Sequence, residues 1–284
     1  MSESRRDHVP EPETTIPHPG RGARGPVVIV RDPVVIYRCD SFAAVDKPPL
    51  WDTQAPPGCP SVETWLAGEL GVPEKSVRAV HRLDRVTGGI LLLALTKKAA
   101  RLLSEQFAAG QIGKVYHAAI RKPKTSAGDA FDWINTDGPN YWTDWIAKQK
   151  NSPRVHLVPD VNARQVHTSD GVVPLEKPLL ARTKISRLRE NQDGDDGVDA
   201  DWLRVQFEPQ SGRMHQLRAQ SAGRSAPIVG DRLYGDNGPW PAGLTTHFEA
   251  GGIALRSVML TLRHPMTAKP IRLRQVLPAR PGTG

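Results

Sequence analysis

The sequence predicts a strand-rich fold with few helices, and three short apolar blocks carry this prediction. Residues 90–95 are six consecutive aliphatic residues, a length and composition typical of a strand buried on both faces. Segments 114–120 and 203–207 are equally short and contain β-branched and aromatic residues, which favour strands. We therefore expect strands to form the framework and helices to pack against it.

The composition indicates a globular protein with a polyanionic partner. The chain has 284 residues, enough for one large domain or two small ones, and its 38% hydrophobic content supports a core. A net charge of +8 favours a polyanion over an acidic protein or a neutral metabolite as partner. The two cysteines, Cys39 and Cys59, form no CxxC pattern, so we expect no disulfide framework or zinc site. Because no signal-like or membrane-length apolar segment is present, we expect a cytoplasmic protein without a membrane anchor.

The N-terminal third is predicted to be a flexible tail followed by the start of the folded domain. Residues 1–26 contain few large apolar groups and cannot repay the entropy of ordering, whereas residues 27–284 are expected to form one folded domain. Strands are expected at 34–37 and 42–45. A helix at 61–70 should begin after the cap Ser61 and end at Gly71.

The central polar segment runs directly into the longest apolar block of the chain. Asp84 lies between Arg82 and Arg85, just before residues 90–95, and a helix capped by Thr96 should span 97–109. A carboxylate in a turn against a core strand is either a local ion pair or a rigidly held nucleophile or general base.

Two later regions are less informative. Trp133, Tyr141, Trp142 and Trp145 lie within the poorly patterned residues 121–180, and they form either packed core or a surface that stacks on nucleotides. The acidic run from Glu190 to Asp201 lacks the ligand spacing of an EF-hand, so a solvated loop between strands at 182–188 and 203–207 is favoured over a calcium site.

Five motifs in one order along the chain resemble those of the RluA family of RNA pseudouridine synthases. The resemblance spans about 42–277 and includes no S4-type domain. The motifs are Asp46-Lys47-Pro48, His81-Arg82-Leu83-Asp84 with Thr87 behind it, Lys114-Val115-Tyr116-His117-Ala118, Gly212-Arg213-Met214-His215-Gln216-Leu217-Arg218 and Pro227-Ile228-Val229-Gly230-Asp231-Arg232-Leu233-Tyr234-Gly235.

The resemblance implies an α+β pseudouridine synthase fold, with a mostly antiparallel sheet in two halves, flanking helices and a central catalytic cleft. It implies that Asp84 is the nucleophile and that Arg218 pairs with Asp84. It also implies that Tyr116 stacks on the target uracil and is a candidate general base. The pairing keeps the carboxylate ionised and oriented. The implied reaction isomerises specific uridines in ribosomal or transfer RNA and needs no cofactor or metal.

The implied partner is a structured RNA whose target uridine is flipped out of its helix, because a stacked base cannot reach the carboxylate. Arg82 is expected to fill the vacated space, or else to pair with a nearby carboxylate. Lys47 is expected to face the phosphate backbone, to support the catalytic turn or to be a solvated loop lysine. Arg213 is expected to point into the cleft, where Gly212 supplies an unusual backbone angle. We expect a monomer.

Two residues depart from the family pattern, and three rival functions are disfavoured. Gly88 replaces a common Ser and is expected to loosen a hydrogen bond near the turn, while Arg256 replaces a common His and is expected to alter substrate contacts. A non-catalytic RNA-binding protein is disfavoured by the joint presence of Asp84, Tyr116 and Arg218. A protein kinase lacks its other motifs here, and a glycosidase lacks a second motif-borne acid.

Overall fold

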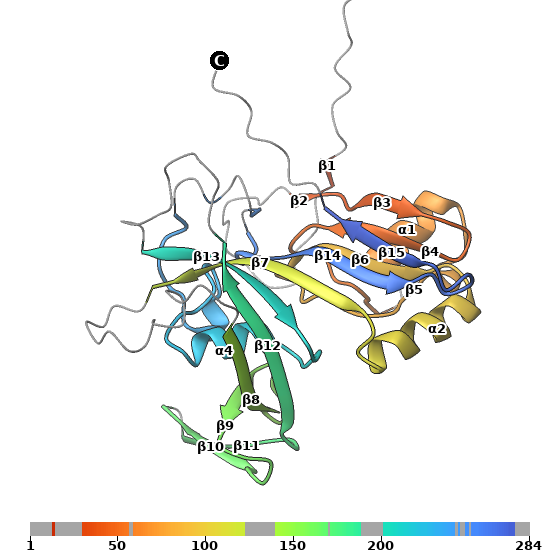
Figure 1. The fold of residues 1–284 in the computed structure, drawn as a ribbon. Coiled ribbons are helices and arrows are strands. Elements are labelled where there is room, and N and C mark those ends of the chain that lie inside the picture. The colour runs from red at the N-terminus through yellow and green to blue at the C-terminus, as the bar shows by residue number, and fades with distance from the viewer. Residues whose placement is uncertain are drawn as a thin grey trace, which may run out of the picture.

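The fold is built on one large twisted sheet, which confirms the expected α+β class. The computed structural model describes residues 13–14, 30–56, 59–122, 140–169, 171–188, 201–241, 244, 248–249 and 251–275. Within these ranges an 11-stranded sheet runs in the order β3-β4-β6-β14-β7-β13-β12-β8-β9, with β5 beside β6 and β15 beside β14 (Figure 1). Its strands pair antiparallel except for β6 with β14, as expected for a mostly antiparallel sheet.

The strands are β1 (Glu13–Thr14), β2 (Val30–Arg31), β3 (Val34–Arg38), β4 (Phe42–Lys47), β5 (Arg78–Ala79), β6 (Gly88–Ala94), β7 (Gly113–Arg121), β8 (Asn140–Lys148), β9 (Val155–Val158), β10 (Gln165–Thr168), β11 (Gly171–Pro174), β12 (Leu179–Arg187), β13 (Trp202–Pro209), β14 (Leu255–Arg263) and β15 (Pro270–Arg274). The helices are α1 (Val62–Leu70), α2 (Lys97–Ala108) and α4 (Gln216–Ala222), with 3₁₀ turns η1 (Glu74–Ser76) and η3 (Arg232–Tyr234).

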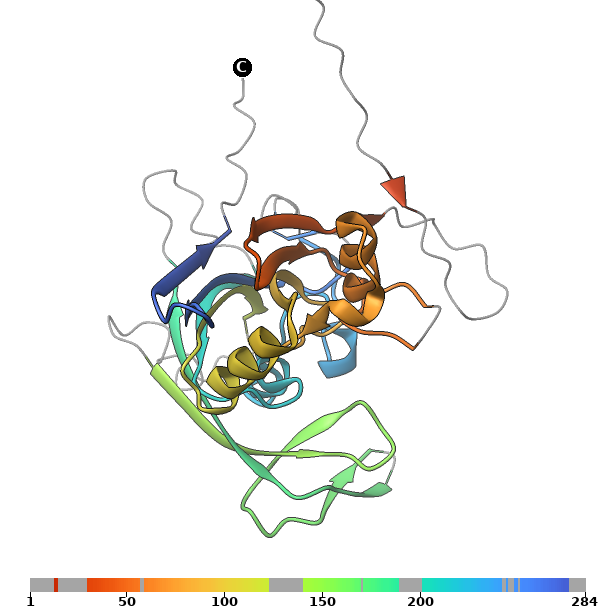
Figure 2. The same cartoon turned by 90° about the vertical axis from the view of Figure 1, so that its right-hand side faces the viewer.

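The two longest helices begin and end where their local sequence predicts. Ser61 caps α1 by accepting a hydrogen bond from the Thr64 N–H, and Gly71 ends the helix with φ of 62°. Thr96 caps α2 by accepting from the Ala99 N–H. Both helices cover the half of the sheet that contains β4 and β6 (Figures 1 and 2).

Strand β6 is the centre of this half and is buried on both faces. Leu91 and Leu93 pack in one cluster with Leu66 of α1, whereas Ile90 and Leu92 pack in another with Leu103 of α2. Alternating residues of a strand point to opposite faces, so a continuous aliphatic run is what a strand between two helical layers requires. The predicted buried strand is therefore confirmed.

The two halves of the sheet meet where β6 and β14 run parallel for two residues. Gly89 lies opposite Ser257 there and has φ of 109°. A Cβ atom at Gly89 would collide with the backbone carbonyl oxygen and nitrogen of Ser257. Only glycine allows this approach, and the turn that carries Asp84 immediately precedes it.

The second half of the sheet continues into an arm formed by β8, β9 and β12, with the β10–β11 hairpin at its end (Figures 1 and 2). Trp142 of β8 is buried and lies 5.6 Å from Phe207 between ring centroids, so of the two alternatives for this residue the packed core is the one observed. Tyr141 next to it is 60% exposed. The predicted pairing of the strands at 182–188 and 203–207 is confirmed by β12 and β13.

Several predictions concern residues outside the described ranges. Apart from the two-residue strand β1, which pairs with β2, the predicted tail at 1–26 lies there, as do Trp133 and nearly all of the acidic run.

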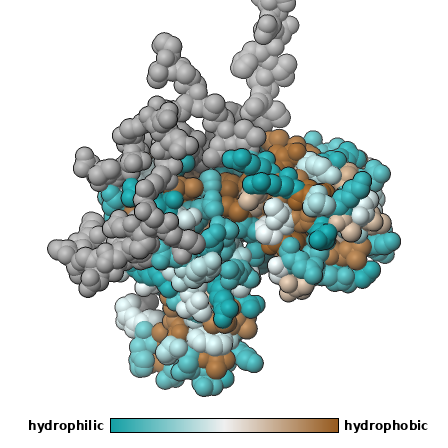
Figure 3. All heavy atoms as spheres, in the orientation of Figure 1, coloured by the Kyte–Doolittle hydropathy of each residue, from teal (hydrophilic) through white to brown (hydrophobic). Residues whose placement is uncertain are grey.

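Among the described residues of the sheet edge, Val34, Val35 and Ile36 of β3 are exposed, and Figure 3 shows hydrophobic residues in this part of the surface. None of the described helices is long and apolar enough to cross a bilayer.

Candidate active site

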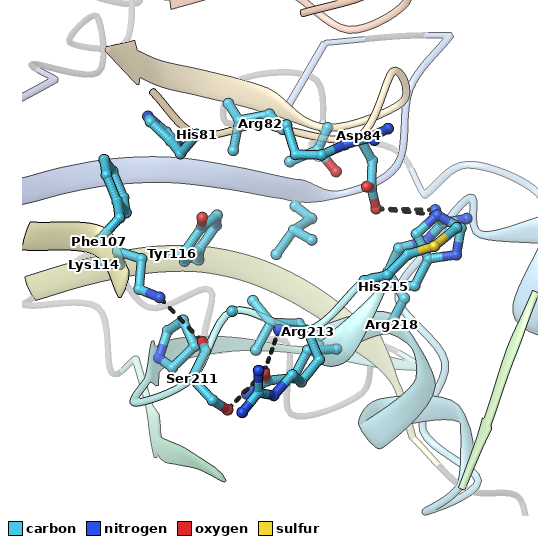
Figure 4. A pocket seen from close by; sticks show the side chains of 18 of the residues that line it. His81, Arg82, Asp84, Phe107, Lys114, Tyr116, Ser211, Arg213, His215 and Arg218 are labelled. Carbon is cyan, nitrogen blue, oxygen red and sulfur yellow. Dashed lines mark hydrogen bonds and ion pairs between the residues drawn. The ribbon is translucent and has the colours of Figure 1, made fainter. Parts of the chain in front are cut away.

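A cavity of about 700 Å³ lies where the turn that carries Asp84 (residues 81–87), the end of α2, strand β7 and the segment leading into α4 come together (Figure 4). Of the six residues predicted for the site, five line this cavity: Arg82, Asp84, Tyr116, Arg213 and Arg218. The sixth, Lys47, does not line it. Residues that are far apart in the sequence thus line the same cavity, and several of them are charged or polar.

The turn that carries Asp84 is held by backbone and side-chain hydrogen bonds to the segment from Leu50 to Thr53. Leu50 N–H donates to the Arg85 carbonyl at 2.6 Å, and Arg85 Nε donates back to the Leu50 carbonyl at 3.0 Å. Thr53 Oγ1 exchanges hydrogen bonds with the Leu83 backbone at 3.1 and 3.3 Å. The turn itself is closed by Thr87 N–H donating to the Asp84 carbonyl. Asp84 is therefore rigidly placed while its side chain faces the cavity.

Lys47 supports this turn from beneath. The side chain is fully buried, and its Nζ donates to the carbonyls of Pro48, Trp51 and Arg85 at 3.1, 2.8 and 3.2 Å. Burial lowers the pKa of Lys47 from 10.5 to about 7. The expected contact of Lys47 with RNA phosphates is therefore wrong, because a fully enclosed ammonium cannot reach them. The alternative, support of the catalytic turn, agrees with these contacts.

Arg218 connects Asp84 to a second, fully buried carboxylate. Its Nη1 donates to Asp84 Oδ2 at 3.1 Å, while Nε and Nη2 donate to both oxygens of Asp231 at 2.7 and 2.9 Å. The side chain is 6% exposed and Asp231 is 1% exposed. The bidentate pair fixes the guanidinium plane, so that its remaining nitrogen is aimed at Asp84. The expected pairing of Arg218 with Asp84 is present.

His215 and Tyr234 are two members of the site that the sequence analysis did not select. His215 Nε2 lies 3.6 Å from Asp84 Oδ2, and its Nδ1 is hydrogen-bonded to Tyr234 Oη at 3.0 Å. The Tyr234 ring also lies 5.1 Å from the guanidinium carbon of Arg218. The two motifs that contain His215, Asp231 and Tyr234 were recognised, and membership of those motifs was the signal that could have identified these residues.

The unusual backbone angle at the start of α4 belongs to His215 and not to Gly212. His215 is the N-cap of α4 and has φ of 50°, in the left-handed region, whereas Gly212 is not among the positive-φ residues of the described chain. The expectation for Gly212 is corrected accordingly. The open space at Gly212 contains only Lys114 Nζ, at 3.7 Å from the position of a Cβ.

Tyr116 lies on β7 opposite Phe207 of β13 and Ser257 of β14, and its side chain lines the cavity. Burial, followed by the negative charge of Asp84, raises the pKa of Tyr116. Its hydroxyl is therefore protonated at neutral pH and available as a hydrogen-bond donor, and the raised pKa does not favour the expected role of Tyr116 as a base. An apolar ring beside the carboxylate is also suited to stack on a base.

The remaining basic residues surround the opening of the cavity. Arg82 is exposed, and no ion pair joins it to another residue in the described ranges. Arg213 is also exposed, and its Nε donates to the Leu180 carbonyl at 3.0 Å. Lys114, which the sequence analysis did not select, lines the cavity and donates to the Ser211 carbonyl at 3.1 Å (Figure 4). These cations give the opening a positive charge suited to a phosphate backbone.

The two departures from the family pattern lie side by side. Arg256 of β14 pairs with Gly88 of β6, and a Cβ at Gly88 would lie 3.0 Å from Arg256 Nη1. Arg256 is 6% exposed, and its Nη2 donates to both carboxylate oxygens of Asp46 at 2.7 Å. It does not line the cavity, so the expectation that Arg256 alters substrate contacts is not supported. The absent side chain at Gly88 leaves room for this buried ion pair.

Comparisons with known proteins agree with this geometry. Residues 42–223 match the family described as RNA pseudouridylate synthase. The chain is 30% identical over 249 residues to tRNA pseudouridine synthase C of Yersinia pestis, with 84% of each chain covered. It is 29% identical to the protein of that name from Pectobacterium carotovorum subsp. carotovorum, covering 84% of this chain and 57% of that one.

Two solved structures share the fold. Human RNA pseudouridylate synthase domain containing 1 aligns with a TM-score of 0.59 at 20% identity, covering 86% of this chain and 83% of that one. Human RNA pseudouridylate synthase domain containing 4 aligns with a TM-score of 0.58 at 20% identity, covering 86% and 88%. With its motifs in the order of the RluA group and a family match over most of the sheet, this chain belongs to the RNA pseudouridylate synthase family.

Proposed function

We propose that this protein converts a uridine of transfer RNA to pseudouridine, with Asp84 as the nucleophile. The observation that carries the proposal is the placement of the Asp84 carboxylate in the cavity, 3.1 Å from a guanidinium that Asp231 holds in place. The names of the curated relatives support transfer RNA as the substrate class. The net charge of +8 agrees with a polyanionic substrate.

The reaction breaks the bond between N1 of uracil and C1′ of the ribose, rotates the base, and joins C1′ to C5. The proton on C5 leaves and N1 gains one, so that the product is an isomer of the substrate. Asp84 attacks C1′, attacks the uracil ring, or assists elimination, and each route requires an ionised and fixed carboxylate. Arg218 stabilises that charge, and the Tyr116 ring supplies a wall on which the base stacks.

The target uridine must leave its helix to reach Asp84, since the carboxylate lies in a cavity and not on a flat face. Arg82 is exposed at the same opening, two positions from the nucleophile. We propose that its guanidinium occupies the space that the extruded base vacates, and that Arg213 contacts the backbone nearby.

Asp84→Asn tests the proposal directly. The variant keeps the shape of the side chain and removes its charge, so it should bind RNA normally and form no pseudouridine. Asp40→Asn is a matched control, because Asp40 is an exposed carboxylate that does not line the cavity. Product is measured by carbodiimide labelling and primer extension. Normal turnover by Asp84→Asn would remove Asp84 from the nucleophile role.

The substrate class is tested in cells that lack the gene. Carbodiimide mapping of transfer and ribosomal RNA should show one or more transfer RNA pseudouridines missing, and the wild-type chain should restore them. Loss confined to ribosomal RNA would replace transfer RNA as the substrate while leaving the chemistry in place. The predicted monomer and cytoplasmic location remain proposals, which sedimentation of the purified chain and cell fractionation test.

A further inference from the structure

We propose that His215 is a positioning residue: its Nε2–H holds the Asp84 carboxylate, and Tyr234 fixes the imidazole tautomer that makes this contact. The inference rests on the proposed role of Asp84 as the nucleophile. It assigns a task to two side chains that the chemistry above does not use.

The geometry places His215 between Asp84 and the partly buried phenol of Tyr234. Its side chain is 9% exposed, with Nε2 at 3.6 Å from Asp84 Oδ2 and Nδ1 at 3.0 Å from Tyr234 Oη. The two rings are also in edge contact, with centroids 5.7 Å apart and planes at 88°. Figure 4 shows His215 beside Arg218, both directed at Asp84. The carboxylate thus faces a second nitrogen besides the guanidinium.

The hydrogen-bond partners of Tyr234 decide which nitrogen of His215 carries the proton. Val155 N–H donates to Tyr234 Oη at 2.9 Å, so the phenol already accepts one bond. Its own O–H is free to donate, and His215 Nδ1 is at donating distance. When Nδ1 accepts, the single proton of the neutral imidazole lies on Nε2, which faces Asp84. At 3.6 Å the contact between Nε2 and Asp84 is longer than a hydrogen bond, and catalytic contacts of this kind often shorten once the substrate is bound.

The backbone of His215 adopts a left-handed conformation, which is uncommon for a residue other than glycine. With φ of 50° and ψ of 23°, His215 is a left-handed N-cap, a position that is normally extended. The preceding loop is fixed by Gln216, whose Oε1 accepts from Ser211 Oγ and from Arg213 N–H at 2.8 and 3.0 Å. Strain that the surroundings enforce is a reason to look for a function of the side chain.

The groups around the imidazole come from every element packed against it. Asp84 and Arg82 face it from the catalytic turn, Arg218 from α4, and Asp231 and Tyr234 from the segment of η3. Burial lowers the pKa of His215 below 6.5, although the Asp84 charge opposes this. His215 is therefore neutral at pH 7, and it orients the carboxylate without cancelling the charge that a nucleophile needs.

Three variants separate the side-chain contact from the backbone strain. Asn tolerates the left-handed region but is too short to reach Asp84, so His215→Asn should fold and yet lose kcat by up to about 100-fold at an unchanged KM for RNA. Gln reaches as far as Nε2 and donates without titrating, so His215→Gln should stay within about threefold of the wild type. Tyr234→Phe keeps the ring under Arg218 and should fall between them.

The pH profile distinguishes this role from a purely structural one. As pH falls below 6.5, protonation of His215 pairs a full positive charge with Asp84, so the wild-type rate should fall, whereas His215→Gln should lack this acid limb. His167→Gln is the matched control, since His167 is exposed on β10, outside the cavity. Urea unfolding of each variant verifies that the compared chains are folded.

Two results overturn the inference. A wild-type kcat in His215→Asn would show that the contact is dispensable. A loss in His215→Gln as deep as in His215→Asn would show that a donor at this position is not what matters. Asp84→Asn is measured alongside: if it remains active, the proposed function fails, whereas an inactive Asp84→Asn with unimpaired His215 variants refutes only the positioning role.

Discussion

Replacing Lys47 with Met should change how the stability of the protein depends on pH. Lys47 is fully buried, and its ammonium donates to three carbonyls around the catalytic turn. Burial lowers its pKa from 10.5 in the unfolded chain to about 7 in the folded one. Methionine has a similar length and no titrating group, so the difference between the two proteins isolates the ammonium.

The sign and size follow from proton linkage. Between pH 7 and 10.5 the unfolded chain keeps the Lys47 proton while the folded chain has largely lost it, so the stability of the wild type rises with pH in this window. With about 1.36 kcal/mol for each pKa unit, the wild type should gain about 2 kcal/mol relative to Lys47→Met between pH 7 and 9. Every other titrating group cancels in the comparison.

The assay is urea unfolding of both proteins at several pH values and constant ionic strength. A difference in the free energy of unfolding that does not change with pH would refute the reasoning. It would mean that the three carbonyls compensate the buried charge completely and that the pKa of Lys47 is ordinary.

The same variant tests whether Lys47 meets RNA. Each phosphate contact contributes a slope of about −0.9 to the dependence of log binding constant on log salt for a duplex. Because Lys47 is enclosed, Lys47→Met should leave this slope unchanged in a filter-binding or fluorescence titration. A slope reduced by about one unit would restore the phosphate contact that the structure contradicts.

Three further predictions concern the neighbourhood of the cavity. Gly89→Ala should cost more than about 3 kcal/mol or prevent folding, as seen in urea unfolding, because its φ of 109° and the nearby Ser257 backbone exclude a side chain; near-normal stability would contradict the parallel contact. Arg82→Ala should reduce the single-turnover rate on folded RNA more than on an unstructured oligonucleotide, while circular dichroism stays unchanged; equal losses on both would argue against a role in base extrusion. Burial lowers the pKa of His81 to about 3, so stability should fall as pH drops from 6.5, and His81→Gln, which can still accept from Leu92 N–H, should weaken this dependence.

Much of the framework followed from local sequence alone. The six aliphatic residues of 90–95 specify a strand buried on both faces wherever it lies, and the caps Ser61 and Thr96 act on their own helices. Asp84 stood out because a polar turn ran directly into that strand. Such features depend on neighbours within a few residues, so they can be predicted from the sequence before any tertiary structure is known.

The order of the family motifs also predicted contacts between residues that no local sequence pattern connects. Asp84 and Arg218 are 134 residues apart, and only their places in two family motifs suggested that they meet. Motif order did not predict every residue of the site, because His215, Asp231 and Tyr234 lie inside these motifs without having been predicted as site residues. A motif names residues, but it does not say which of them face the cavity.

Tertiary structure alone decided the environment of each charged side chain. Lys47 ends a strand and precedes two prolines, a context equally compatible with a solvated loop, and its burial became apparent only from the carbonyls that surround it. Arg256 likewise is buried against Asp46 because Gly88, on a different strand, leaves the space. Burial and charge pairing are properties of what packs over a residue, and those neighbours come from all along the chain.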